Sequence, residues 1–237
     1  MTMDAKNLWS YNPLPNNCIL WIPFWNQPAT RGPKFITPDM YRRICTATGT
    51  EWRADGRYFD GLNDWVNCGD IAQGFDGVNN KLTAIAWVRP TEQTAGQFYA
   101  VAKYDDNLRT FYLNSTATGA VRGLVAKTGA ASHYFYHTTD TTPISVDNWY
   151  CVGAVFDLAN QLMTLYVDGS LVASTATVAG TPPIVFDDTT SVVEINSAKQ
   201  GTLFGDAGYI GEVGLWTSLY SAEEMAYYYA KTRGRYK

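Results

Sequence analysis

The sequence NWYCVGAVFDLANQLMTLYVDGSLVAS, from Asn148 to Ser174, decides the fold class. It contains Asp168-Gly169, a dipeptide that a two-residue type I′ turn prefers because both central residues need positive φ. Before this turn Met163, Leu165 and Val167 occupy every second position. This period of two predicts strands with one buried face, joined as antiparallel hairpins. The pattern is typical of a β-sandwich.

Working outward, the chain repeats this pattern of short segments separated by Gly, Asp and Asn, which favours a single all-β domain. A Pro- and Gly-containing stretch at 27–41 is expected to be a long loop. The expected strands are 19–25, 43–45, 50–52, 58–59, 65–67, 83–88, 98–104, 109–113, 121–127, 134–137, 149–157, 162–167, 170–177, 192–195 and 207–216. Residues 1–17 are expected to form an extended N-terminal arm, and residues 18–237 the domain.

One helix is expected, from Ala222 to about Lys231. Ser221 is placed to cap its first turn, and Glu224 completes a capping box three residues later. Met225, Tyr228 and Tyr229 share a helical face and are expected to contact the core, together with Trp87, Trp149 and Trp216 from strands. The basic end of the chain, 231–237, is expected to be a solvent-exposed tail whose positive charges are favourable at the C-terminal end of the helix.

Composition and charge exclude several classes of protein. Hydrophobic residues make up 46% of the chain and aromatic residues 14%, which is enough for a pleated core. With 18 basic and 22 acidic residues and no basic stripe, nucleic-acid binding is disfavoured. The longest apolar run, CILWIPF at 18–24, is too short to span a membrane, and no signal peptide is visible. Such a chain stays in the cytosol, leaves by a signal-independent route, or is released by lysis.

The four cysteines, Cys18, Cys45, Cys68 and Cys151, show no CxxC pair, which argues against a zinc or redox motif. One or two disulfides would be compatible with an extracellular protein. Buried free thiols that pack as small hydrophobic side chains are the expected state.

Five runs in order resemble a known family. They are RYFDGLNDWVNCG (57–69), LTAIAWVRP (82–90), AVAKYD (100–105), the hairpin region (148–174), and GYIGEVGLWTSLYSAEEMAYYY (208–229). Their order is similar to that of a laminin G-like domain of the concanavalin A-like jelly-roll superfamily. The resemblance covers roughly residues 20–229. It implies an all-β fold with two antiparallel sheets in a jelly-roll sandwich, an extended arm and a short C-terminal helix.

The superfamily also contains glycoside hydrolases, but the residues that such chemistry needs are not recognisable. Hydrolysis needs two carboxylates on opposite sides of a sugar, whereas the acidic clusters here are adjacent pairs that point to opposite faces of a strand. His133 and His137 lack a third metal-ligand partner, and no GxSxG or phosphate loop is present. We therefore expect no catalytic residues and no enzyme activity.

A structural calcium ion is the cofactor that the resemblance implies, because many relatives bind Ca²⁺ through Asp or Asn side chains and carbonyl oxygens. The matching positions are Asp60 and, less directly, Glu212. Oxygens from Asn63, Asp64 and Asp70 are available nearby. The alternative is that Asp60-Gly61 is a turn former that uses Asx hydrogen bonds, and composition alone does not distinguish the two.

Carbohydrate binding is the activity that the fold family suggests, and it has to be argued from residues because a fold does not determine a function. A sugar site needs an exposed aromatic ring for the apolar face of a pyranose, with amides or carboxylates for its hydroxyls. The candidate ligand-binding residues in loop-rich runs are Tyr104, Asp105, Asn107, Tyr134 and Tyr136.

The segment 34–61 further resembles stand-alone domains encoded by tailed phages and environmental viruses. This implies a non-catalytic virion surface component, a decoration or tail-associated protein assembled in the host cytoplasm. Its partners would be other virion proteins or further copies of itself, contacted through Trp9 and Tyr11 of the arm, with surface glycans as ligands. The alternative is a soluble, calcium-dependent, lectin-like module.

Overall fold

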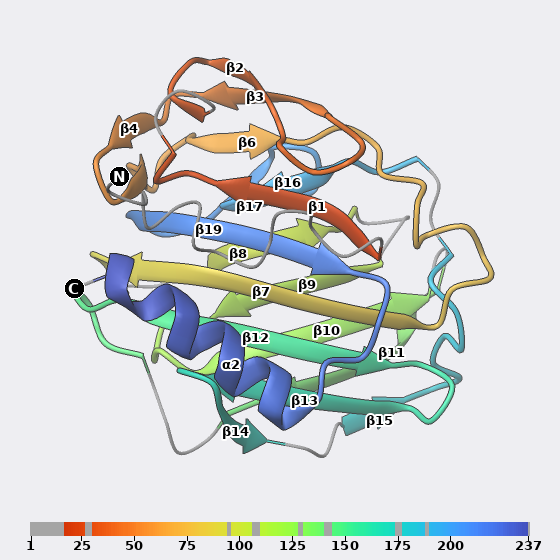
Figure 1. The fold of residues 1–237 in the computed structure, drawn as a ribbon. Helices are drawn as coiled ribbons and strands as arrows, with labels where there is room; N and C mark the ends of the chain where they lie inside the picture. Colours follow the sequence, from red (N-terminus) through yellow and green to blue (C-terminus); the bar gives the residue numbers. More distant parts are fainter. Residues whose placement is uncertain are drawn as a thin grey trace.

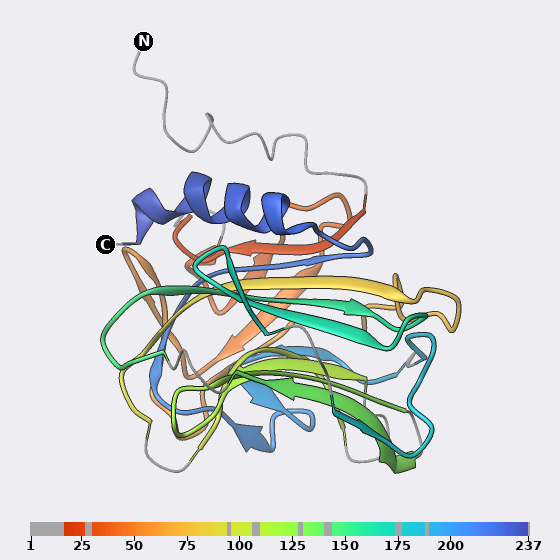
Figure 2. The ribbon, with the colours of Figure 1, turned by 90° about the horizontal axis from the view of Figure 1, so that it is seen from below.

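The computed structural model describes residues 17–26, 30–93, 96–105, 110–127, 130–139, 144–173, 177–187 and 190–236. The described strands form two large antiparallel sheets that lie face to face, with helix α2 (Ala222–Thr232) outside one of them (Figure 1). Figure 2 shows the same layers from below. The expected all-β, two-sheet jelly-roll sandwich with a C-terminal helix is confirmed.

The eight-stranded sheet lies next to the helix. Its order is β14-β13-β12-β7-β19-β5-β4, and β1 pairs with β19. The bounds are β14 (Ser170–Ala173), β13 (Leu162–Val167), β12 (Tyr150–Asp157), β7 (Lys81–Pro90), β19 (Gly208–Trp216), β5 (Gly56–Phe59), β4 (Glu51–Arg53) and β1 (Cys18–Pro23). Asp168 and Gly169 have φ of 52° and 75°, so the turn between β13 and β14 has the positive φ values that a type I′ turn requires.

The nine-stranded sheet has the order β15-β11-β10-β9-β8-β16-β6-β3-β2. The bounds are β15 (Thr177–Ala179), β11 (Ala130–Thr138), β10 (Val121–Lys127), β9 (Phe111–Ser115), β8 (Phe98–Lys103), β16 (Val193–Ile195), β6 (Trp65–Asn67), β3 (Ile44–Thr48) and β2 (Lys34–Ile36). A two-stranded ribbon of β17 (Ser197–Ala198) and β18 (Leu203–Phe204) follows β16.

The position of β7 near the centre of its sheet explains why the sequence of this strand is apolar almost throughout. Leu82 and Ala86 belong to the core between the sheets, whereas Ile85 and Trp87 face outward into a second cluster beneath α2. Because both faces of the strand are covered, the alternation of polar and apolar residues disappears. The molecule therefore has one core between its sheets and a second under its helix.

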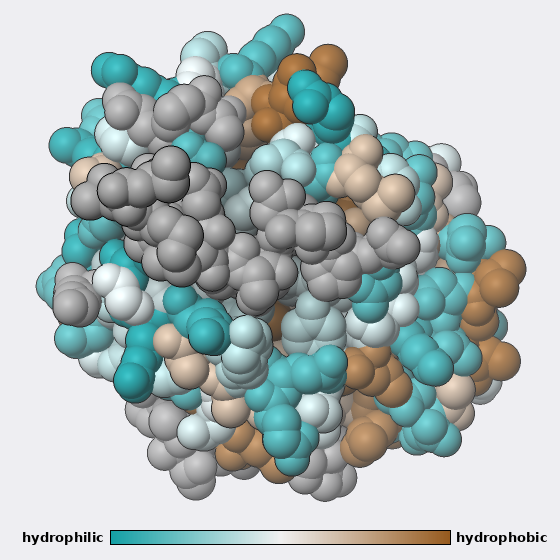
Figure 3. Space-filling view, viewed as in Figure 1, coloured by the Kyte–Doolittle hydropathy of each residue, from teal (hydrophilic) through white to brown (hydrophobic). Residues whose placement is uncertain are grey.

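Helix α2 begins as predicted. The Ser221 side chain accepts a hydrogen bond from Glu224 N, and the Glu224 side chain accepts one from Ser221 N, which completes the capping box. The helix lies close to the sheet: a Cβ on Gly153 would be 2.3 Å from Met225 Cε. In Figure 3 the surface over α2 is mostly hydrophilic, as expected when the apolar side of a helix faces a sheet.

The structure corrects two strand assignments. The expected loop at 27–41 contains β2, which pairs with β3 and buries Phe35. The expected strand at 170–177 is split, because β14 pairs with β13 in one sheet and β15 pairs with β11 in the other. A period-two pattern predicts extended chain but does not show where the chain crosses between sheets.

The three tryptophans expected in the core differ in how deeply they are buried. Trp87 and Trp216 are buried, but they lie beneath α2 and not between the sheets, and Trp149 is half-buried just before β12. The four cysteines are buried free thiols, as expected. None of the described helices combines the length and the apolar character needed to cross a bilayer.

Candidate functional site

A cleft of about 510 Å³ lies where helix α2 ends, between the 3₁₀ turn η1 (Arg233–Arg235) and the turn that joins β13 to β14. This volume is within the range of small-ligand sites. Aromatic, cationic and carboxylate side chains share its walls. The lining residues are Trp87, Trp149, Asp168, Tyr229, Ala230, Lys231, Arg233, Gly234 and Tyr236.

Stacked rings form the aromatic wall of the cleft. Trp87 stacks on Tyr229 with ring centroids 5.7 Å apart and on Tyr236 at 4.4 Å, and Trp149 lies 4.8 Å from Tyr236. Trp87 and Tyr236 are almost fully buried, whereas Trp149 and Tyr229 are only half-buried. Trp149 and Tyr229 therefore supply the accessible aromatic surface, and the two buried rings fix their position.

Local sequence explains why these rings meet. After α2, the turn η1 returns the chain to the sheet, so that Tyr236 lies against β19. Its ring occupies space that a side chain at 211 would need, because a Cβ on Gly211 would be 2.2 Å from Tyr236 Cε1. Trp87 Nε1 donates to Thr232 Oγ1 at 2.8 Å, which ties the last helical turn to the same wall.

The carboxylate that lines the cleft belongs to Asp168. Its Oδ1 accepts a hydrogen bond from Cys151 N at 2.9 Å, and its own N donates to Cys151 O at 2.8 Å. Burial raises the pKa of this carboxyl, and the hydrogen bond from Cys151 opposes part of that rise. Gly169 brings the turn against the helix, since a Cβ there would be 2.9 Å from Ala226 Cα. Asp168 is thus positioned by backbone contacts.

The rim of the cleft carries two exposed cationic side chains. Lys231 Nζ lies 5.1 Å from the centre of the Tyr227 ring, and Arg233 Cζ lies 5.7 Å from the centre of the Tyr229 ring. In this arrangement a bound molecule would meet aromatic faces, a carboxylate acceptor and positively charged donors together.

The tyrosines predicted from the sequence lie on the opposite side of the molecule, on the outer face of the nine-stranded sheet. Tyr134 and Tyr136 are neighbours on β11 with ring centroids 5.8 Å apart. Cross-strand pairing places Tyr136 beside Leu124, and Leu124 beside Tyr112, which is 5.6 Å from Tyr104. The structure therefore brings the three predicted tyrosines, 104, 134 and 136, onto one face.

Of the two polar residues predicted beside these tyrosines, Asp105 lies within the described residues and Asn107 does not. Asp105 Oδ2 accepts a hydrogen bond from Gln200 Nε2 at 2.5 Å. Asn107 lies outside the described residues, as do Trp9 and Tyr11 of the arm.

The two residues expected to bind calcium are not brought together. Asp60 follows β5, where Phe59 pairs with Gly208, and its Oδ1 accepts from Leu62 N at 2.9 Å in an Asx turn. Glu212 lies four residues farther along β19, roughly 13 Å at the usual rise of a strand. Among the described residues no group of three or more His, Cys, Asp or Glu side chains is arranged to bind a metal ion.

Glu212 has protein partners beneath the helix. It is fully buried and accepts hydrogen bonds from Trp25 Nε1 at 2.7 Å, from Arg235 Nη1 at 3.2 Å and from the Tyr228 hydroxyl. A buried carboxylate is expected to be satisfied in this way. In this structure Glu212 connects β19, the start of the domain and the C-terminal segment.

The cleft residues were not singled out from the sequence. Asp168 was interpreted as a turn former, Tyr229 as a core contact and the basic end as a solvated tail. The available signal was the run YYYAKTRGRYK at 227–237, in which tyrosines are followed by basic residues through the end of a well-capped helix. Its meaning depends on the β13–β14 turn, which is distant in sequence.

The fold and the site define a class: a jelly-roll sandwich with an aromatic cleft at the end of a helix on one outer face. A family model, Laminin_G_3, described as Concanavalin A-like lectin/glucanases superfamily, matches residues 52–226, which is more than half of the chain. The chain belongs to this superfamily. No curated protein matches it.

Solved structures share the fold at low sequence identity. Trypanosoma rangeli sialidase in complex with sialic acid matches with a TM-score of 0.68 and 14% identity, over 94% of this chain and 34% of that chain. Botulinum neurotoxin type C, described as interacting with two ganglioside molecules, matches with a TM-score of 0.68 and 7% identity, over 93% of this chain and 52% of that chain. The binding domain of botulinum neurotoxin serotype D matches with a TM-score of 0.65 and 9% identity, over 91% of this chain and 52% of that chain. This chain spans about a third of the sialidase and about half of the neurotoxin chains.

Proposed function

We propose that this chain is a non-catalytic carbohydrate-binding module and that the cleft at the end of α2 is its sugar site. One observation carries the proposal: half-buried aromatic rings, a carboxylate and cationic side chains border one cleft of about 510 Å³. A pyranose has an apolar face that stacks on aromatic rings and hydroxyls that need polar partners. Trp149 and Tyr229 supply the first kind of contact, and Asp168 supplies the second.

The arrangement favours binding over hydrolysis. Asp168 is the one carboxylate among the described residues that line the cleft, whereas glycoside hydrolysis usually needs two on opposite sides of the bond. One oxygen of Asp168 already accepts a backbone hydrogen bond. Two of the similar structures are described with sialic acid or gangliosides, which is a property of those proteins that agrees with the proposal.

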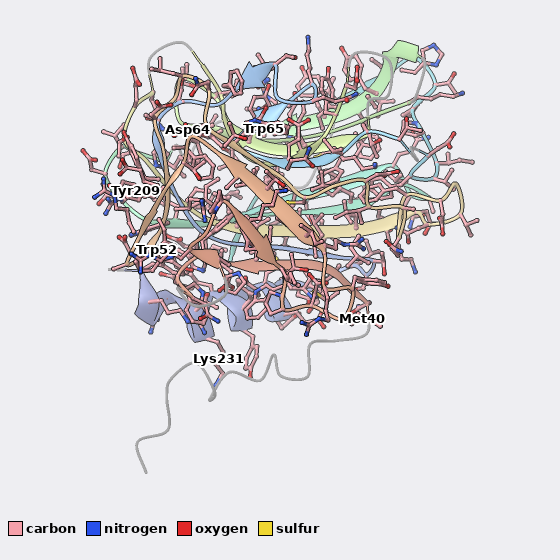
Figure 4. The ribbon with its side chains drawn as sticks, turned by 90° about the horizontal axis from the view of Figure 1, so that it is seen from above. Met40, Trp52, Asp64, Trp65, Tyr209 and Lys231 are labelled. Atoms are coloured by element: carbon pink, nitrogen blue, oxygen red, sulfur yellow. The ribbon has the colours of Figure 1, made fainter. Side chains whose placement is uncertain are left out.

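The test begins with a glycan array probed with the whole chain, followed by calorimetry with the best glycan and the Trp149→Ala variant. We expect affinity to fall about tenfold or more, because the variant removes an aromatic contact surface. Trp65→Ala is the matched control. Trp65 is also half-buried, and Figure 4 shows it on the opposite side of the sandwich from Lys231, so its loss should leave affinity unchanged.

Two results would overturn the proposal. Equal affinity of the Trp149→Ala variant and the original chain would remove the cleft from the site. Cleavage of any array glycan that disappears in an Asp168→Asn variant would contradict the non-catalytic assignment.

Calcium dependence remains a prediction from the sequence. If Asp60 contributes to an ion site, a chelator should lower the melting temperature of the chain and have no effect on an Asp60→Asn variant. Unchanged melting with chelator would favour the Asx turn at Asp60 as its whole role.

The virion surface role also remains a prediction, and the described residues do not bear on it. It expects Trp9 and Tyr11 to contact another virion protein or a second copy of the chain. Alanine at both positions should then abolish incorporation into particles while the melting temperature stays the same.

A further inference from the structure

The three cationic side chains at the end of α2 differ in their partners. Arg235 donates to Glu212 Oε2 at 3.2 Å and lies 4.5 Å from the centre of the Trp25 ring. Lys231 and Arg233 line the cleft, and neither has a carboxylate within 4.0 Å among the described residues. Arg235, which does not line the cleft, is paired with a carboxylate, whereas the two cations that border the cleft are not.

The helix dipole does not explain this difference. Cations are favoured near the C-terminal end of any helix, and that effect applies to all three side chains. Asp168 also lines the cleft, and one of its oxygens accepts from Cys151 N. The cleft therefore presents two exposed positive charges and one partly buried carboxylate, which is a net positive rim around an aromatic wall.

We infer that the cleft binds a glycan unit that carries a carboxylate, an inference that rests on the proposed function. The sugar ring would stack on Tyr229 and Trp149. Its carboxylate would accept two parallel N–H bonds from the planar Arg233 guanidinium, with Lys231 as a second positive charge. Asp168 would accept from a sugar hydroxyl. A neutral sugar could make the stacking contact but would offer no carboxylate to either cation.

The experiment compares matched ligands by calorimetry on the whole chain: 3′-sialyllactose against lactose, and trigalacturonate against galactotriose. We expect at least one acidic member to bind about tenfold tighter than its neutral counterpart. The Lys231→Gln/Arg233→Gln double variant should lose that difference, so that the acidic and neutral members of each pair bind it with similar affinity. The control is Arg31→Gln/Lys34→Gln, which removes the same charge from exposed positions in or before β2, on the other sheet.

The outcomes separate the two proposals. If acidic and neutral ligands bind equally and the double variant matches the original chain, the carboxylate inference fails while sugar binding stands. If no ligand binds here or on the array, the proposed function fails as well. If 3′-sulfolactose binds tighter than 3′-sialyllactose and Arg233→Lys changes neither affinity, the ligand group is not a carboxylate read by a planar fork.

Discussion

The two outer faces of the sandwich carry aromatic residues in different settings. On the eight-stranded sheet, α2 buries Trp216 and Tyr228, and where it ends Tyr229 and Trp149 remain half-buried beside the cleft. On the nine-stranded sheet, which no described helix covers (Figure 2), Tyr136 is half-buried beside its neighbours. One face has a bounded cleft and the other has a row of rings across strands.

The difference shows how a covering element creates a site. The end of a helix brings cationic side chains next to rings that its own packing has already ordered, so aromatic and charged groups meet in one cleft. An uncovered sheet presents rings at strand spacing, with Tyr136 beside Leu124 and Tyr112. Such a surface offers stacking without the enclosing walls that orient a small ligand.

The largest expected effect tests how much the buried contacts beneath α2 stabilise the fold. Glu212→Ala should lower the free energy of unfolding by about 3–5 kcal/mol, because Arg235, Trp25 and Tyr228 would lose a shared buried partner. Urea denaturation measures it. Glu212→Gln should cost less, since an amide oxygen still accepts. Tyr136→Ala, on the uncovered face, should cost less than Glu212→Ala, and equal losses would contradict the distinction between the faces.

A smaller effect tests the helix without touching the cleft. Ser221→Ala removes the capping hydrogen bond to Glu224 N and should cost about 1 kcal/mol. The cap is at the first turn, whereas the cleft is at the last, so glycan affinity should be unchanged. If affinity falls together with stability, helix and cleft form one cooperative unit.

Much of the fold was predictable because it depends on local chemistry. The Asp168-Gly169 turn, the Ser221 capping box and the alternation in β13 each involve residues close in sequence. The crossing between β14 and β15 was not predictable, because alternation is the same whichever sheet a strand joins. The position of β2 within a Pro- and Gly-containing stretch depends on its pairing with β3.

The site was less predictable for the same reason. Tyr104, Tyr134 and Tyr136 were predicted as ligand-binding residues from their loop-rich surroundings; the structure places them on one face, and their role in binding stays a prediction. The cleft combines Trp87, Asp168 and Arg233, three residues from distant parts of the chain. Asp60 and Glu212 show the reverse case. The family resemblance named both positions, but Asp60 follows Phe59, which pairs with Gly208, and Glu212 lies four residues beyond Gly208 along β19.

The smallest expected effect belongs to the nine-stranded sheet and concerns Glu194. Val193 and Ile195 point into the core, so Glu194 points outward, where the chain at 197–201 covers it and Gly201 N donates to its Oε2 at 3.1 Å. Burial raises the pKa of this carboxyl, with Asp105 adding to the rise, and hydrogen bonds from Ser197, Gly201 and Gln200 oppose it.

The sign of the resulting pH dependence follows from linkage. The folded chain binds this proton more tightly than the unfolded chain, so the contribution of Glu194 is fully present below the ordinary glutamate pKa and is lost as pH rises through the raised value. Glu194→Gln retains an acceptor for Gly201 N and does not titrate. Its free energy of unfolding, relative to that of the original chain, should therefore increase from pH 4 to pH 7. A difference that stays constant with pH would show that the pKa of Glu194 is the same in the folded and unfolded chains, which would contradict the effect of burial.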